Sequence, residues 1–198
     1  MKHLLAVLAV LAFAPARTWA QDTNDLQRLF EAGQYQRVVE STAPEAPPAA
    51  LYVAAQSHQK LGAAEQAADV YRQLAERPEG DPWRLIGLSA QSLLQNDAEG
   101  AVRAAEQAAN ESGDLPEAHY QLGLAQAKRQ DWRAAAAAFD RAVELDPAMA
   151  YAHYYGGLMH YRANRPDRMA NHFEQFLKLA PDAPERPEVL QIMRTLRR

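Results

Sequence analysis

The sequence reads PEAHYQLGLAQAKRQDWRAAAAAFDRAVELDPAM from Pro116 to Met149 and AYAHYYGGLMHYRANRPDRMANHFEQFLKLAPDA from Ala150 to Ala183. A glycine, a phenylalanine and a proline each recur 34 residues apart, in the pairs Gly123/Gly157, Phe139/Phe173 and Pro147/Pro181. Three residue types with different structural roles share one spacing. The two segments are therefore predicted to be copies of one structural unit.

The same register extends upstream over two further units. Small residues stand 34 and 68 positions before Ala135, at Ala101 and Ala67, and before Gly123, at Ser89 and Ala55. We therefore predict four units without a gap, at 48–81, 82–115, 116–149 and 150–183. One internal position of the units is occupied by Gly62, Asn96, Gln130 and Asn164, and three of these four suit a left-handed or turn conformation.

Each unit is predicted to be a pair of helices. Apolar residues recur three and four positions apart on both sides of the internal turn, which is helical spacing. Prolines mark the breaks between units, and Asp81-Pro82 is typical of an N-cap followed by proline in the first helical turn. The 41 alanines also favour closely packed helices. The sequence thus predicts an all-α fold.

The repeat unit resembles the tetratricopeptide repeat (TPR) in its length and in its motif. The residues that carry the resemblance are His119, Leu122, Gly123, Ala135, Phe139 and Pro147. Histidine stands at 119 and 153, where the family usually has tryptophan. The resemblance implies a right-handed α-solenoid of stacked helix-turn-helix units, whose first helices line a concave wall.

Shorter segments flank the four units. Residues 21–47 are predicted to form a shortened N-terminal helix pair and a proline-rich loop, because Gly33 lies only 29 residues before Gly62. Residues 184–198 are predicted to form a C-terminal capping helix that begins near Pro187. Its apolar stripe consists of Val189, Ile192, Met193 and Leu196.

Residues 1–20 have the organisation of a bacterial signal peptide. Lys2 precedes an apolar run from Leu4 to Ala14, which is too short to cross a bilayer as a helix. Small residues then offer cleavage after Ala20, which we favour, or after Ala16. Retention as an N-terminal anchor is the alternative. This pattern predicts an exported protein of the Gram-negative periplasm or a secreted protein.

Composition excludes several classes of function. The formal charge is −4, so a nucleic acid is not an expected partner. The chain has no cysteine, which excludes disulfides, thiolate metal sites and a thiol nucleophile. It also lacks a glycine-rich phosphate loop and an H-E-x-x-H motif. We therefore expect neither enzymatic activity nor a cofactor.

The histidines are interpreted as packing residues. They stand at positions 58, 119, 153, 160 and 172 in the repeat region. His153 and His160 are two helical turns apart, a rise of about 10 Å, which is too far for one metal ion without a third group between them. No metal site is therefore predicted.

The resemblance to the TPR family implies which residues line the concave wall. These residues are Tyr52, Gln56, Gln59, Trp83, Ile86, Leu93, Tyr120, Leu124, Tyr151, Tyr154, Leu158 and Tyr161. Such an aromatic and apolar groove suits a helix or an extended peptide. The alternative is that single tyrosines in this row are ordinary packing residues of the family.

These observations predict an exported protein–protein interaction scaffold. Its groove would bind a peptide or helix of a cell-envelope partner, and so assist assembly of an envelope complex. After cleavage of the signal peptide, no association with the membrane is expected. The alternative function is a structural TPR protein that self-associates into a homo-oligomer without a peptide ligand.

Overall fold

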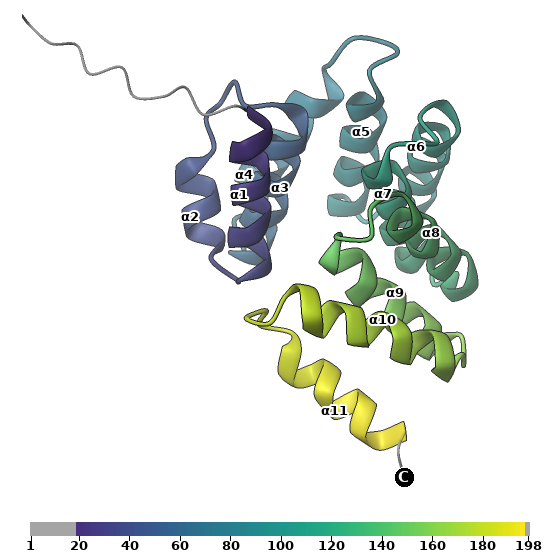
Figure 1. The fold of residues 1–198 in the computed structure, drawn as a ribbon. Helices are drawn as coiled ribbons and strands as arrows, with labels where there is room; N and C mark the ends of the chain where they lie inside the picture. The colour runs from purple at the N-terminus through teal and green to yellow at the C-terminus, as the bar shows by residue number, and fades with distance from the viewer. Residues whose placement is uncertain (1–18, 197–198) are drawn as a thin grey trace, which may run out of the picture.

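The computed structural model describes residues 19–196, and this range contains helices and no strands (Figure 1). The helices are α1 (Trp19–Glu31), α2 (Tyr35–Ser41), α3 (Pro48–Lys60), α4 (Ala64–Ala75), α5 (Pro82–Leu94), α6 (Ala98–Glu111), α7 (Pro116–Lys128), α8 (Trp132–Leu145), α9 (Ala150–Arg162), α10 (Pro166–Leu179) and α11 (Arg186–Leu196). The all-α solenoid prediction is confirmed. Apart from Trp19 and Ala20, the expected signal peptide lies outside the described residues. Within 19–196, no helix is long and apolar enough to span a membrane.

Each of the four 34-residue ranges contains one helix pair, from α3–α4 to α9–α10. The residue at the internal turn has a positive φ in every pair: Gly62 (+74°), Asn96 (+61°), Gln130 (+66°) and Asn164 (+57°). The left-handed conformation that three of these residues suit is thus observed at each of them. Gln130 adopts it as well, although glutamine has no intrinsic preference for it, and a hydrogen bond of 2.9 Å from the backbone N–H of Asp131 to the carbonyl oxygen of Gln126 closes this turn.

The glycines at the 34-residue spacing allow the two helices of a pair to approach closely. A Cβ atom on Gly123 would lie 2.7 Å from Cζ of Phe139, and one on Gly157 would lie 2.5 Å from Cδ1 of Phe173. Both phenylalanine rings are completely buried. The recurring glycine and phenylalanine therefore form one contact that is repeated in the third and fourth units.

The helix ends and the C-terminal cap follow local sequence signals. Oδ1 of Asp81 accepts a hydrogen bond of 3.0 Å from the backbone N–H of Trp83, so the predicted N-cap of α5 is confirmed. The last helix begins at Arg186, one residue before the predicted start. Val189 of α11 is completely buried, and Ile192 and Met193 pack against the same core.

The N-terminal helix pair reaches the fourth unit, which the sequence did not predict. The ring centroids of Phe30 and Tyr151 are 5.0 Å apart. Nζ of Lys60 lies 2.6 Å from Oε1 of Glu185 in the loop between α10 and α11. In Figure 1 this loop points toward the turn that follows α1, and a Cβ on Gly33 in that turn would lie 2.7 Å from Cγ of Pro184. The two ends of the solenoid therefore meet, and side chains from α1 occupy part of its concave side.

Candidate functional site

Two neighbouring cavities lie on the concave side. The first, here named the acidic cavity, has a volume of about 490 Å³ and is bordered by α1, α3, α7 and the start of α9. The second, named the tyrosine cavity, has a volume of about 380 Å³ and is bordered by α1, α3, α4, α5, α7 and α9. Phe30, Gln56 and Tyr120 line both. The two cavities therefore form one interrupted groove.

The twelve predicted wall residues differ widely in exposure. Those that are buried are Tyr52, Ile86, Tyr120, Tyr151 and Tyr154. Those that are half-buried are Gln56, Trp83, Leu93, Leu124 and Leu158, while Gln59 and Tyr161 are exposed. The expectation that the aromatic row lies on an open wall is therefore wrong for four of its tyrosines. Their rings belong to the packed interior.

The buried polar contacts explain why Tyr52 is a core residue. Its hydroxyl donates a hydrogen bond of 2.6 Å to Oε1 of Gln121, whose Nε2 donates one of 3.0 Å to Oγ of Ser89. Gln121 is 1% exposed and Ser89 is completely buried. This chain of hydrogen bonds links the first, third and second units, so Tyr52 holds the solenoid together.

Tyr154 also has a structural role. Its ring packs 5.2 Å from that of Phe176, and its hydroxyl donates to Oε2 of Glu188 at 3.0 Å. Truncation of Tyr154 would therefore destabilise the protein, since it would open the contact between α9, α10 and α11. The wall residues that line neither of the two cavities are Trp83, Ile86, Tyr154, Leu158 and Tyr161.

Sequence reasoning missed three carboxylates that line the acidic cavity: Glu31, Glu117 and Asp146. Glu31 accepts a hydrogen bond of 3.0 Å from Nε2 of Gln27. Oε2 of Glu117, by contrast, is buried and has no hydrogen-bond partner. One cation, Arg28, stands at the border of this cavity, where it pairs with Asp25. Most of the charged side chains among the described residues that line this cavity are thus negative.

Burial raises the pKa of both glutamates above the ordinary value of 4.5. The negative charge of Asp146 raises the two pKa values further. Among the described residues, Glu31 accepts from the neutral amide of Gln27, and Oε2 of Glu117 has no partner. The acidic cavity is therefore suited to a cationic group that has aromatic or apolar neighbours.

The repeat register contained a signal for one of these carboxylates. Glu117 lies 34 residues after Trp83 and 34 before Tyr151, both of which were assigned to the wall. Because Glu117 is not aromatic, the aromatic pattern of the wall positions does not indicate it. Glu31 and Asp146 lie outside this register position, and tertiary structure alone brings them to the cavity.

In the tyrosine cavity the polar groups satisfy one another. The hydroxyl of Tyr71 donates to Oε1 of Gln59 at 2.7 Å, and Nζ of Lys128 donates to Oδ1 of Asn96 at 2.7 Å. Lys60 is paired with Glu185. Tyr155, which the sequence analysis did not assign to the wall, lines this cavity. The tyrosine cavity therefore offers apolar and aromatic surface rather than an unpaired charge.

Four of the histidines in the repeat region fall into two groups. Nε2 of His119 lies 3.1 Å from the carbonyl oxygen of Gly113, and Nε2 of His153 lies 3.2 Å from that of Pro147, so the two equivalent histidines make equivalent contacts. His160 and His172 instead converge on one carboxylate outside the groove. Among the described residues, this second group has the geometry of metal ligands.

Comparison with known proteins identifies the family. Tetratricopeptide repeat models match residues 49–79, 90–147 and 120–184, and the chain belongs to this family. Its members are protein–protein interaction scaffolds and are typically not enzymes. No curated protein matches the chain.

Solved TPR structures share the fold at low sequence identity. The thermophilic TPR protein TTC0263 of Thermus thermophilus has a TM-score of 0.64 and 18% identity, over 89% of this chain and 99% of that one. YrrB, described as a TPR protein with an unusual peptide-binding site, has a TM-score of 0.52 and 17% identity, over 89% and 92%. A MamA structure has a TM-score of 0.50 and 14% identity, over 84% and 96%. These similarities show the fold alone.

Proposed function

We propose that this chain is an exported scaffold whose concave side binds a segment of a cell-envelope protein, with a basic side chain of that segment in the acidic cavity. The signal-like residues 1–20 support export. The TPR fold supports a protein partner. The acidic cavity supports the choice of a lysine or arginine as the anchoring residue, and assistance in assembling an envelope complex is the role we assign to the interaction.

The observation that carries this proposal is the unpartnered oxygen of Glu117. A buried acceptor without a hydrogen bond costs the folded protein about 1 to 3 kcal/mol. An ammonium or guanidinium donor from a ligand would satisfy Oε2 of Glu117 and neutralise its charge. Glu117 is therefore the residue that we assign as the anchor for a basic side chain of the ligand.

The adjoining surface suits the rest of a peptide. Phe30 and Tyr120 form part of both cavities, so a ligand that enters the acidic cavity continues over the tyrosine cavity. The half-buried side chains of Leu93, Leu124 and Tyr155, which line the tyrosine cavity, offer apolar and aromatic contact area there. Among the similar structures, YrrB is also described as having a peptide-binding site, which supports this use of the fold.

Glu117→Gln is expected to stabilise the free protein by about 1 kcal/mol at pH 7, because it removes a buried, unpaired negative charge. Since the pKa of Glu117 is raised in the folded protein, protonation stabilises the folded wild type as the pH falls. The difference in free energy of unfolding between Glu117→Gln and the wild type should therefore decrease as the pH falls through the pKa of Glu117 in the folded protein. It should vanish below pH 4.5, the ordinary pKa of a glutamate. Urea denaturation at pH 7 and pH 4 measures both differences.

The same variant should weaken peptide binding. Random peptides displayed on phage and selected on the wild-type protein should carry lysine or arginine beside apolar residues. Replacing the selected arginine by citrulline, or the selected lysine by norleucine, should weaken binding about tenfold or more, since a hydrogen bond to a charged group contributes about 1.5 to 3 kcal/mol. Glu117→Gln should cause a similar loss, measured by fluorescence anisotropy.

Glu144→Gln provides the matched control, because Glu144 is an exposed glutamate of α8 outside the groove. It should bind the selected peptides like the wild type. Selected peptides without basic residues, or equal affinity of the wild type and Glu117→Gln, would refute the proposed anchor. A concentration-dependent mass in light scattering together with a failed peptide selection would favour the self-associating alternative.

Export has its own test. Expressed with its natural N-terminus in a Gram-negative host, the protein should appear in the periplasm with Gln21 as its first residue. Cleavage after Ala20 would remove two residues of α1 and retain Phe30 and Glu31. N-terminal sequencing decides between this start, a start after Ala16, and retention of Met1. A membrane fraction that contains the uncleaved chain would show that residues 1–20 are an anchor.

A further inference from the structure

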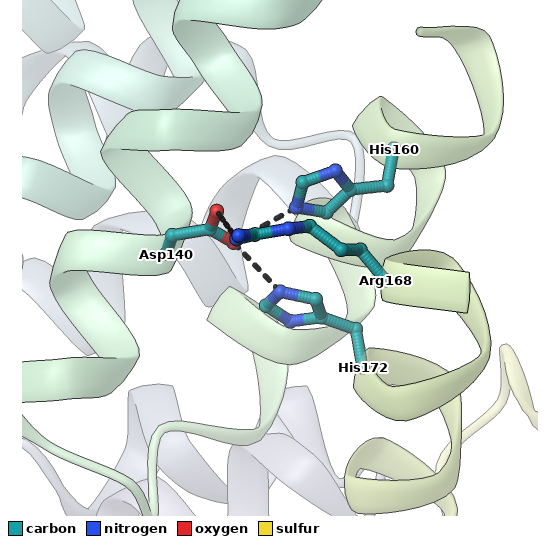
Figure 2. Close-up of polar contacts among 4 residues, drawn as sticks. All are labelled: Asp140, His160, Arg168 and His172. Carbon is teal, nitrogen blue, oxygen red and sulfur yellow. Dashed lines mark hydrogen bonds and ion pairs between the residues drawn. The ribbon is translucent and has the colours of Figure 1, made fainter. Parts of the chain in front are cut away.

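Two histidines and one aspartate converge at the junction of the third and fourth units (Figure 2). Oδ1 of Asp140 lies 2.9 Å from Nε2 of His160 and 2.8 Å from Nε2 of His172. Asp140 belongs to α8, His160 to α9 and His172 to α10. The three atoms all lie within 4.8 Å of one another. Three rigid helices therefore present three metal-ligand atoms to one point.

The separations are close to those that a metal ion requires. In a tetrahedral zinc site with bonds of about 2.0 to 2.1 Å, ligand atoms are about 3.3 Å apart. Asp140 would have to move from each imidazole nitrogen by about half an ångström to admit the ion. The two imidazole nitrogens, which lie within 4.8 Å of each other, would have to adjust to the same separation.

The surroundings of these three side chains also favour a bound metal ion. Nη1 of Arg168 donates to Oδ2 of Asp140 at 3.1 Å, which orients the carboxylate and leaves Oδ1 toward the imidazoles. A cavity of about 250 Å³, lined in part by Asp140 and His160, adjoins them. It has room for an entry path and for water as a fourth ligand.

Buried nitrogen atoms at this junction also lack partners. Nδ1 is buried without a hydrogen bond in His153, His160 and His172. The ring of His172 lies 5.3 Å from that of His153 and 5.2 Å from that of His160, measured between centroids. In His160 and His172 the ligand atom is Nε2, so metal binding would leave Nδ1 as an N–H donor that a water molecule would have to satisfy.

The repeat register shows that stacking does not require these residues. The positions equivalent to His172 hold Ala138, Ala104 and Val70, and those equivalent to Gly156 hold Leu122, Leu88 and Ala54. A Cβ on Gly156 would lie 2.9 Å from the ring of His172. Compared with the second and third units, the fourth unit has glycine in place of leucine and histidine in place of alanine, and the absence of a side chain at Gly156 makes room for the imidazole.

We propose that Asp140, His160 and His172 bind a first-row divalent metal ion, with zinc as the ion to be tested, and that the bound ion fastens the third unit to the fourth. Two imidazoles and one carboxylate favour zinc and its neighbours over Mg²⁺ and Ca²⁺, which prefer oxygen ligands. The site lies outside the acidic and tyrosine cavities and does not depend on the proposed peptide binding.

Isothermal titration of the untagged protein with ZnCl₂ tests this site. The wild type should bind one zinc ion, should not bind Mg²⁺ at the same concentrations, and should melt at a higher temperature with zinc. Asp140→Asn retains an acceptor for the two histidines but loses the charged ligand, so its zinc affinity should fall at least tenfold. Binding of Co²⁺ should produce visible absorption bands in the wild type that this variant lacks.

The double variant Gly156→Leu/His172→Ala is a second test in which misfolding is not expected. It has the same residue pair as the equivalent positions of the third unit, Leu122 and Ala138. It should retain the wild-type helical signal in circular dichroism and lose zinc binding at least tenfold. His119→Gln removes a histidine elsewhere and should bind zinc like the wild type. The proposal is wrong if the wild type shows no saturable binding, or if the double variant and Asp140→Asn bind zinc as tightly as it does.

Discussion

Gly123→Leu is expected to lower the free energy of unfolding by about 3 kcal/mol, the upper part of the usual range for overpacking. A Cβ alone would lie 2.7 Å from Cζ of Phe139, and leucine adds three further carbon atoms. Phe139 is completely buried and cannot turn into solvent. The helices α7 and α8 must therefore separate, which urea denaturation followed by far-UV circular dichroism would detect.

Gly113→Leu is the matched control for this substitution. Gly113 is exposed, and the nearest atom to a Cβ there is the carbonyl oxygen of Ala109 at 3.4 Å. Its unfolding midpoint should stay close to that of the wild type. The double variant Gly123→Leu/Phe139→Ala should recover part of the free energy of unfolding that Gly123→Leu loses, because leucine would fill space left by the phenylalanine ring. A Gly123→Leu variant as stable as the wild type would show that the contact between α7 and α8 is wrong.

Phe30→Ala is expected to destabilise the protein by about 3 to 4 kcal/mol, as other truncations of buried phenylalanine do. Phe30 is 3% exposed, and its ring centroid lies 5.3 Å from that of Tyr35 and 5.0 Å from that of Tyr151. It connects the N-terminal helix pair to the fourth unit. The variant should also have a larger radius of gyration in small-angle X-ray scattering, because the ends of the solenoid would separate.

Tyr161→Ala removes an aromatic ring from α9 where the side chain is exposed, since Tyr161 is 49% accessible. Its stability should change by less than about 0.5 kcal/mol, as for most surface substitutions. The radius of gyration should also stay the same. If Phe30→Ala and Tyr161→Ala had equal stability and equal dimensions in solution, the contact between the ends of the solenoid would not exist in solution.

The local features of the fold could be predicted from the sequence because each depends on residues close together in the chain. The spacing of Gly123 and Phe139 specifies a contact between two consecutive helices, and the turn at Asn164 closes one pair. The N-cap at Asp81 depends on residues two apart. In such cases local backbone preference and helical periodicity are sufficient, and the register carries them from one unit to the next.

The site could be predicted less well because it depends on contacts between distant segments. The resemblance to TPR proteins indicated which helices line the concave side. It did not show that Phe30 and Glu185 would close over Tyr151, since these contacts join residues 34 to 121 positions apart. The extra segments outside the four units bury Tyr151, and Glu31 from α1 adds a carboxylate to the acidic cavity.

The histidine cluster also combines a local feature that the sequence determines with contacts that only the tertiary structure decides. The sequence determined that His153 and His160 are too far apart on one helix to share a metal ion, because helical rise fixes their separation. Tertiary structure decided that His160 faces Asp140 and His172, which come from two other helices. By itself, then, the sequence determined the repeat, its turns and its helix pairs, because local periodicity encodes them. Only the tertiary structure decided which side chains are exposed and which meet, because packing between distant helices sets both.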